Sequence, residues 1–142
     1  MTERADLTWH GGRHIEARIR DLVVVHDKPK EKGYTNLGPT PSEMFLATLA
    51  SCTMMSTLRV AEVRKVPVQA MSATAELDFD AQDKVSVVRL EIQVQSAAAA
   101  KDWEVIARMA GKFCTIEQLT KPPIQKRFVL NGKDRIEVEK AD

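Results

Sequence analysis

Two cysteines are the residues of this 142-residue chain whose chemistry stands out, and they lie in different patterns. Cys52 ends the run GPTPSEMFLATLASC, which is apolar on almost every side. Cys114 lies in GKFCTIEQL, after a glycine that we expect to end a helix and before residues that favour a new helical turn. The exposed N–H groups at a helix start lower the pKa of a thiol. A reactive thiol with a distant second thiol is typical of cysteine-based peroxidases.

In that chemistry a thiolate attacks the peroxide O–O bond and becomes a sulfenic acid, which a second thiol converts to a disulfide. A cation must hold the thiolate, and Arg13, Arg18 and Arg20 in the N-terminal part are candidates. Each of these residues also has a purely structural interpretation. Free cysteine is often simply a buried core residue, so Cys52 and Cys114 also fit the core. The arginines also fit a solvated strand face.

Composition excludes several other classes of function. Charged residues are balanced, with a net charge of +1, so nothing indicates a nucleic-acid binder. No apolar run approaches the roughly 20 residues of a membrane span. The start, MTERADLTWH, has no hydrophobic signal region, so we expect a cytoplasmic protein with reduced thiols and no membrane partner.

The sequence also indicates no metal and no cofactor. His10 and His14 are four positions apart in strand-like sequence, which predicts a separation of about 13 Å, too far to chelate one ion. No glycine-rich phosphate loop, GxSxG or CxxC motif occurs.

A long helix should position Cys52. Thr40 is a candidate N-cap, Pro41 suits the first helical position, and Glu43 completes a capping box. The pattern runs to about Lys65, and Pro67 prevents continuation. Because a helix that is apolar all round is typical of a core, we expect this one to be buried.

Alternating patterns predict strands around that helix, and a second amphipathic pattern predicts another helix. The predicted strands are HIEARIR, LVVVHD, QAMSATAELDFD, SVVRLEIQV and the two halves of RFVLNGKDRIEVE, which form a hairpin at Asn131-Gly132. The second helix is AAAAKDWEVIARMAG, with CTIEQL as a further helical stretch. KPKEKGYTNLGP should be an exposed, mobile connector. This order predicts a single α+β domain over residues 1–142, with a mostly antiparallel sheet wrapping a long central helix.

These motifs resemble a known family. GPTPSEMFLATLASC is similar to the first-cysteine motif of the OsmC/Ohr superfamily, and the second cysteine and the order of elements match along essentially the whole chain. The resemblance implies an OsmC-like fold and an intertwined homodimer with its central helices back to back. It implies that Cys52 and Cys114 lie close together and that Cys52 reduces organic hydroperoxides. Cys114 would then be the resolving cysteine, which reacts with the oxidised Cys52. Arg18 is the arginine that we expect to assist, and a lipoyl-type dithiol should recycle the enzyme.

The sequence departs from the peroxidase branches of that superfamily at two places. Their second cysteine usually begins Cys-Pro, whereas here it begins Cys114-Thr115, and their assisting glutamate falls where this chain has Ser42. The chain looks more like the less characterised OsmC-like branch, which has Pro-x-Glu-Met before the helix.

Three hypotheses for function stay open at this point. The first is a thiol-dependent hydroperoxide reductase active in oxidative-stress defence. The second is a non-enzymatic protein whose dimer pocket holds an apolar small molecule against Met44, Phe45, Met54 and Met55. The third is a redox sensor that reports through a Cys52–Cys114 disulfide.

Overall fold

The helix predicted after Thr40 forms as α1, Pro41–Val63. Its capping box is complete, because the Glu43 N–H donates to Thr40 Oγ1 at 3.3 Å and the Thr40 N–H donates to a Glu43 carboxylate oxygen at 3.2 Å. Lys65, just beyond its end, takes a left-handed φ of 57°. The predicted start is confirmed, and the helix ends two residues before the predicted position.

By length and composition alone, α1 is also apolar enough to cross a membrane, the one such helix among residues 1–139. The expectation that no apolar run reaches this length is therefore wrong. The core helix of a soluble protein meets the same criterion, so one such helix does not by itself indicate a membrane span.

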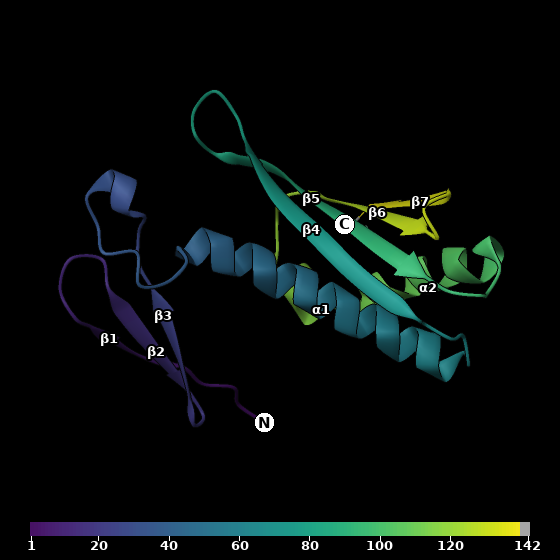
Figure 1. The fold of residues 1–142 in the computed structure, drawn as a ribbon, viewed down its shortest axis with the longest axis horizontal. Helices are drawn as coiled ribbons and strands as arrows, with labels where there is room; N and C mark the ends of the chain where they lie inside the picture. The colour runs from purple at the N-terminus through teal and green to yellow at the C-terminus, as the bar shows by residue number, and fades with distance from the viewer. Residues whose placement is uncertain (140–142) are drawn as a thin grey trace. The chain divides into compact units, whose positions relative to one another are not determined.

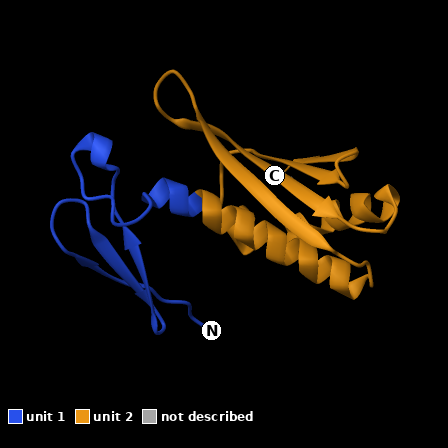
Figure 2. Cartoon of the chain, viewed as in Figure 1, with its two compact units in different colours: residues 1–45 blue, residues 46–142 orange. Residues whose placement is uncertain are grey.

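The computed structural model describes residues 1–139, and the chain divides into two compact units between Phe45 and Leu46 (Figure 2). The first unit holds β1 (Asp6–Trp9), β2 (Ile15–Ile19) and β3 (Leu22–His26), a 3-10 turn at Lys30–Lys32, and the first residues of α1. The three strands form an antiparallel sheet in the order β1-β2-β3.

A buried carboxylate organises the connector that follows β3. Asp27 accepts hydrogen bonds from the Thr35 hydroxyl, from the Lys28 N–H at 2.7 Å and from the Leu37 N–H at 3.1 Å. The side chains around these contacts are mostly exposed, as predicted. The three bonds give the connector a defined path that its polar composition did not predict.

The second unit is a four-stranded sheet with helices on one face. Its elements are the rest of α1, β4 (Ala70–Phe79), β5 (Val85–Gln95), α2 (Ala100–Phe113), α3 (Thr115–Gln118), β6 (Ile124–Leu130) and β7 (Asp134–Glu139) (Figure 1). The strand order is β4-β5-β6-β7, with β5 and β6 parallel and the other pairs antiparallel. The α+β class and the mostly antiparallel pairing are confirmed, although the strands form two sheets.

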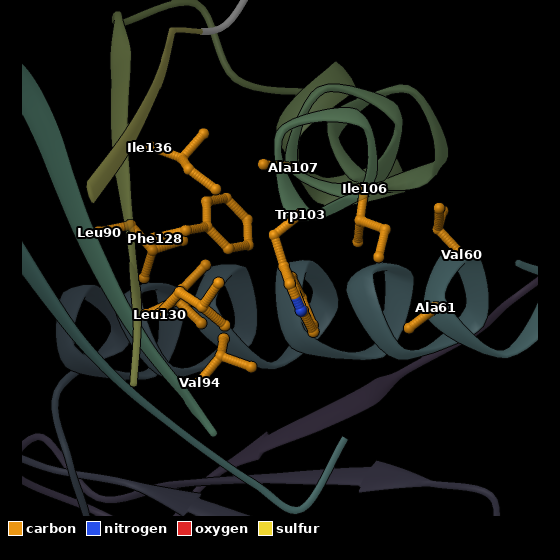
Figure 3. Close-up of a cluster of buried hydrophobic side chains, with 11 residues drawn as sticks. Val60, Ala61, Leu90, Val94, Trp103, Ile106, Ala107, Phe128, Leu130 and Ile136 are labelled. Carbon is orange, nitrogen blue, oxygen red and sulfur yellow. The ribbon is translucent and has the colours of Figure 1, made fainter. Parts of the chain in front are cut away.

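The core of this unit joins α1, α2 and one face of the sheet (Figure 3). Val60 and Ala61 of α1 meet a cluster that contains Trp103 and Ile106 of α2. On β5, the side chains of Leu90, Ile92 and Val94 are at most 3% exposed, which confirms the predicted alternation of buried and exposed residues. Burying these apolar side chains supplies most of the favourable free energy that fixes α2 over the sheet.

The predicted face of β4 is confirmed except at its end. The alternation in QAMSATAELDFD predicts Phe79 on the same face as Leu77, but Phe79 is 57% exposed. The register between β4 and β5 shifts between Asp78 and Phe79, because Ser86 on β5 is an extra, unpaired residue, and the regular pairing of β4 ends there.

The predicted hairpin at Asn131-Gly132 is confirmed. Both residues have positive φ, 52° and 71°, and the Lys133 N–H closes the turn by donating to the Leu130 carbonyl at 3.0 Å, in a three-residue loop between the paired residues Leu130 and Asp134. The Asn131 side chain also accepts from the Ser96 N–H at 2.8 Å and donates to the Ser96 carbonyl at 2.7 Å. These bonds tie the β6–β7 turn to the segment between β5 and α2.

Candidate functional site

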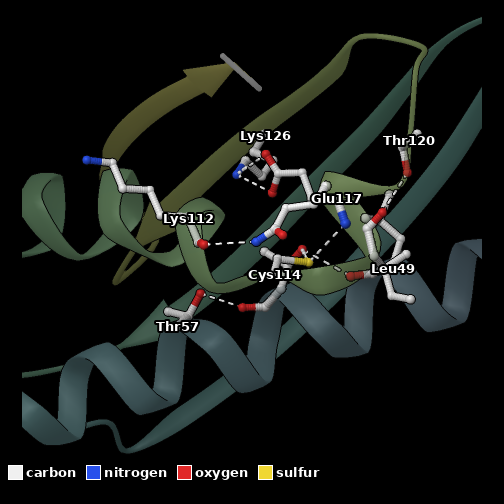
Figure 4. Close-up of polar contacts among 10 residues, drawn as sticks. Leu49, Thr57, Lys112, Cys114, Glu117, Thr120 and Lys126 are labelled. Atoms are coloured by element: carbon white, nitrogen blue, oxygen red, sulfur yellow. Dashed lines mark hydrogen bonds and ion pairs between the residues drawn. The ribbon is translucent and has the colours of Figure 1, made fainter. Parts of the chain in front are cut away.

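Cys114 lies at the junction of α2 and α3, fully buried. It is the N-cap of α3, and the Glu117 N–H donates to its Sγ at 3.4 Å (Figure 4). The prediction of a new helical turn at Cys114 is confirmed. The prediction that Gly111 ends the preceding helix is wrong, because α2 continues to Phe113.

The structure brings the two thiols together. Cys52, on α1, is half-buried, and its neighbour Thr53 has its hydroxyl 3.9 Å from Cys114 Sγ. The pKa of Cys114 is raised to about 11: burial raises it most, and a hydrogen bond with Cys52 and the negative charge of the Cys52 thiolate also raise it. The Glu117 N–H and the Thr53 hydroxyl act to lower the pKa of Cys114.

The net effect on Cys114 is opposite to the expectation drawn from the helix start. The short α3 offers one N–H to the sulfur, and the desolvation of a buried thiolate outweighs that bond. Cys114 is therefore a protonated thiol near neutral pH. Cys52 is the more exposed of the two sulfurs, so it is the one that a peroxide or another thiol reaches first.

The apolar surroundings expected for Cys52 are found on one side only. Leu49 is fully buried, but Met55 is 71% exposed. The buried positions of α1, Leu49, Thr53, Ser56, Thr57, Val60 and Ala61, form one stripe. The opposite stripe is exposed and contains Ser51, Met55 and Leu58. The expectation that this helix is buried therefore holds for one of its faces.

A buried ion pair lies behind Cys114 and was missed by sequence reasoning. Lys126 Nζ donates to both carboxylate oxygens of Glu117, at 3.0 and 2.8 Å (Figure 4), and the two side chains are 1% and 5% exposed. Removing one partner of such a pair costs about 3–5 kcal/mol, because the other charge stays buried. Lys126 alternates with Ile124 and Phe128 on the inward face of β6, so a lysine on an apolar face was the available signal.

Gly111 makes room for this pair. A Cβ at that position would lie 2.7 Å from Lys126 Nζ and 3.2 Å from a Glu117 carboxylate oxygen. Only glycine therefore leaves the pair in place without a shift, which explains a glycine inside α2.

Arg18 is placed in the first unit, exposed on β2 opposite Asp6 and Val23 in the strand register. The thiols belong to the second unit, so the assisting role of Arg18 stays a prediction. Arg13, another candidate, lies over the Tyr34 ring at 5.6 Å. Glu43 is engaged in the capping box.

The two N-terminal histidines are closer than expected. Their ring centroids are 5.0 Å apart, because Gly11 and Gly12, both with positive φ, turn the chain between β1 and β2. The separation of about 13 Å expected for an extended strand is therefore wrong. Within residues 1–139, no group of three or more His, Cys, Asp or Glu side chains is arranged to hold a metal ion.

The fold and the two neighbouring cysteines are those of a known class of protein. The family model of OsmC-like proteins matches residues 33–127, and the chain belongs to this family. A search of curated protein sequences finds no significant match.

Solved structures of similar fold include proteins of the same family. The OsmC-like protein of Mycoplasma pneumoniae has a TM-score of 0.80 at 13% identity, covering 92% of this chain and 97% of that one. An OsmC-like protein of unknown function from Vibrio cholerae has a TM-score of 0.76 at 18% identity, covering 91% and 99%. An organic hydroperoxide resistance protein of Legionella pneumophila has a TM-score of 0.68 at 21% identity, covering 92% and 96%. These TM-scores establish a shared fold.

Proposed function

We propose that the protein is a thiol-dependent reductase of organic hydroperoxides, with Cys52 as the peroxidatic thiol and Cys114 as the resolving thiol. The observation that carries the proposal is the placement of the two cysteines: Thr53, the neighbour of half-buried Cys52, has its hydroxyl 3.9 Å from the sulfur of fully buried Cys114, and Cys52 raises the pKa of Cys114. The hydroperoxide resistance protein of Legionella supports the same chemistry through a shared family and fold.

The proposed reaction has three balanced steps. The Cys52 thiolate attacks the peroxide O–O bond, which gives a Cys52 sulfenic acid and, after protonation of the leaving oxygen, an alcohol. The Cys114 thiol then attacks the Cys52 sulfur, so that an S–S bond forms, the S–O bond breaks, and water leaves with the Cys114 proton. A lipoyl-type dithiol reduces the disulfide and is itself oxidised to a disulfide.

We further propose that the active form is a cytoplasmic homodimer. The exposed stripe of α1, which contains Met55 and Leu58, is an apolar surface that a second copy would cover. The first unit has its own exposed apolar side chains, Leu7, Trp9 and Leu22 among them. The family match at residues 33–127 crosses the boundary between the units, which supports one OsmC-like domain over residues 1–142. In the dimer, Arg18 is the cation proposed for the Cys52 thiolate.

Consumption of cumene hydroperoxide with a dithiol reductant tests the proposal. Cys52→Ser should abolish turnover, because a serine hydroxyl is not ionised near neutral pH. Cys114→Ser should allow one oxidation and then stall with a sulfenic acid that a dimedone probe labels. Ser51→Ala is the matched control, since its hydroxyl only bonds the Ala47 carbonyl of its own helix, at 2.7 Å.

A second measurement asks whether the thiols form a bond at all. Mild oxidation should produce an intramolecular Cys52–Cys114 disulfide, detected by peptide mapping without reduction. If the disulfide forms but wild type and Cys52→Ser consume hydroperoxide equally, the redox-sensor alternative takes the place of the reductase. An apolar molecule that co-purifies in native mass spectra, without disulfide formation, supports the ligand-binding alternative.

A further inference from the structure

The buried ion pair of Glu117 and Lys126 has no part in the peroxide chemistry described above, yet one of its members contacts the resolving thiol through its backbone. Glu117 donates its N–H to Cys114 Sγ at 3.4 Å, while its carboxylate takes two hydrogen bonds from Lys126. The same residue is therefore held at one end by β6 and presents its amide to the sulfur at the other.

This amide belongs to a helix too short to hold itself in place. α3 has four residues, Thr115–Gln118, and a helix of one turn is not stable alone. The ion pair is its one contact between oppositely charged side chains, and it fastens the turn to a central strand of the sheet. The geometry of the N–H at the sulfur then depends on that fastening.

We propose that Glu117 and Lys126 are positioning residues for the resolving thiol: the buried ion pair holds the α3 turn so that the Glu117 N–H stabilises negative charge on Cys114 as it attacks the Cys52 sulfur. The proposal rests on the thiol-pair chemistry proposed above. The pair carries one positive and one negative charge, so removing both leaves the net charge beside Cys114 unchanged. An effect on Cys114 then does not arise from a change of net charge, and the position of the amide is its main cause.

The attack of Cys114 can be measured without any peroxide. Dithionitrobenzoate reacts first with the accessible Cys52, forming a mixed disulfide and releasing one thionitrobenzoate. The Cys114 thiolate then attacks the Cys52 sulfur, the mixed S–S bond breaks, and a second thionitrobenzoate leaves, while the Cys114 proton passes to solvent. Cys114→Ser should release only the first equivalent, which identifies the second phase.

The Glu117→Gln/Lys126→Met double variant removes both charges at nearly constant volume. We expect its second phase to slow by about tenfold at pH 7, the effect of weakening one hydrogen bond to a developing charge, and its pH–rate profile to move to higher pH. Lys121→Met is the matched control, because it removes an exposed lysine from the α3–β6 connection and should leave both readouts at the wild-type values. A folded double variant with the wild-type rate and pH profile overturns the proposal.

Gly111→Ala decides the question if the double variant does not fold. Alanine favours a helix interior over glycine, so the variant should fold, but its Cβ would lie 2.7 Å from Lys126 Nζ and 3.2 Å from a Glu117 carboxylate oxygen, so the two charged groups must shift from their present geometry. The second phase should slow and its pH profile should rise, and an unchanged second phase overturns the proposal. If these effects appear while the wild type consumes no hydroperoxide, the positioning role stands and the reductase function alone fails.

Discussion

The Thr53 hydroxyl on α1 lies 3.9 Å from the sulfur of Cys114 and 3.0 Å from the Leu49 carbonyl of its own helix. A hydroxyl has one proton, so it can donate to only one of these two acceptors at a time. With Cys114 protonated, the carbonyl is the better acceptor. Once Cys114 becomes a thiolate, rotation of the hydroxyl toward the sulfur stabilises the new charge without a change of backbone.

The first prediction is that Thr53→Val slows the resolving step. Valine cannot donate to the sulfur, so the pKa of Cys114 should rise above the value of about 11 in the wild type. Thiolate formation then becomes less favourable, and the release of the second thionitrobenzoate should slow several-fold. Thr57→Val is the control, because this residue is also buried and also donates to the carbonyl four residues earlier, at 2.7 Å. Equal rates in the two variants would contradict the role given to Thr53.

The second prediction concerns stability at alkaline pH. The folded pKa of Cys114 is raised above its ordinary value of 9.0, so between pH 9 and about 11 the unfolded chain releases the thiol proton and the folded chain keeps it. Folding stability from this group is thus fully present below pH 9 and is lost as the pH rises toward 11. Urea unfolding should show a steeper alkaline loss in the wild type than in Cys114→Ala. Parallel curves for the two proteins would show that Cys114 titrates normally.

The third prediction is that Met55→Lys converts the protein from a dimer to a monomer. Met55 is 71% exposed within the chain and lies on the uncovered stripe of α1, so in the proposed dimer a lysine there would place an unpaired charge in an apolar interface. Light scattering measures the change. Phe79→Lys is the control, because Phe79 is an exposed aromatic residue at the end of β4 that is farther from α1 in the sequence. A wild-type monomer would reject the proposed interface.

The fourth prediction is that Asp27→Asn loosens the connector before α1. The Thr35 hydroxyl lowers the pKa of Asp27, opposed by burial, and the Leu37 and Lys28 N–H groups lower it further. Because the folded pKa is depressed, the stabilisation is present above 3.8 and is lost as the pH falls through the folded value. The Leu37 amide should exchange its hydrogen about tenfold faster in the variant at pH 7.

A matched control exists for this test in the exposed turn between β2 and β3. Asp21→Asn changes the same chemical group at a solvent-exposed position, and it should leave the exchange of Leu37 unchanged. If both variants, or neither, alter Leu37 exchange, the carboxylate of Asp27 is not what orders the connector.

Local signals in the sequence were sufficient where a structure depends on neighbouring residues. The capping box at Thr40 and Glu43 and the hairpin at Asn131-Gly132 are formed by residues within three positions of each other, and both are confirmed. The family resemblance, carried by the run that ends at Cys52, is confirmed by the family match.

The errors arose where the answer depends on long-range packing or an irregular backbone. Phe79 is exposed at the end of β4, where the regular β4–β5 register stops, and no alternating pattern shows such a shift. The pKa of Cys114 rises because α1 and the Cys52 thiol cover it, which a local helix-start argument omits. The sequence pattern predicts that a helix ends at Gly111. In the structure, the glycine is needed because Glu117 and Lys126 leave no room for a larger side chain.

The parallel pairing of β5 with β6 has a consequence for the order of folding. Adjacent parallel strands need a crossover, and here the crossover is α2 and α3, which carries Cys114. Pairing of this kind joins residues distant in sequence and is slow to form, whereas the β4–β5 hairpin is local. A growing chain that has completed α1 and this hairpin presents Cys52 without its partner. A Cys52–Cys114 disulfide should then form only in chains that have completed the β5–β6 pairing. A pulse of oxidant during refolding would show when this happens.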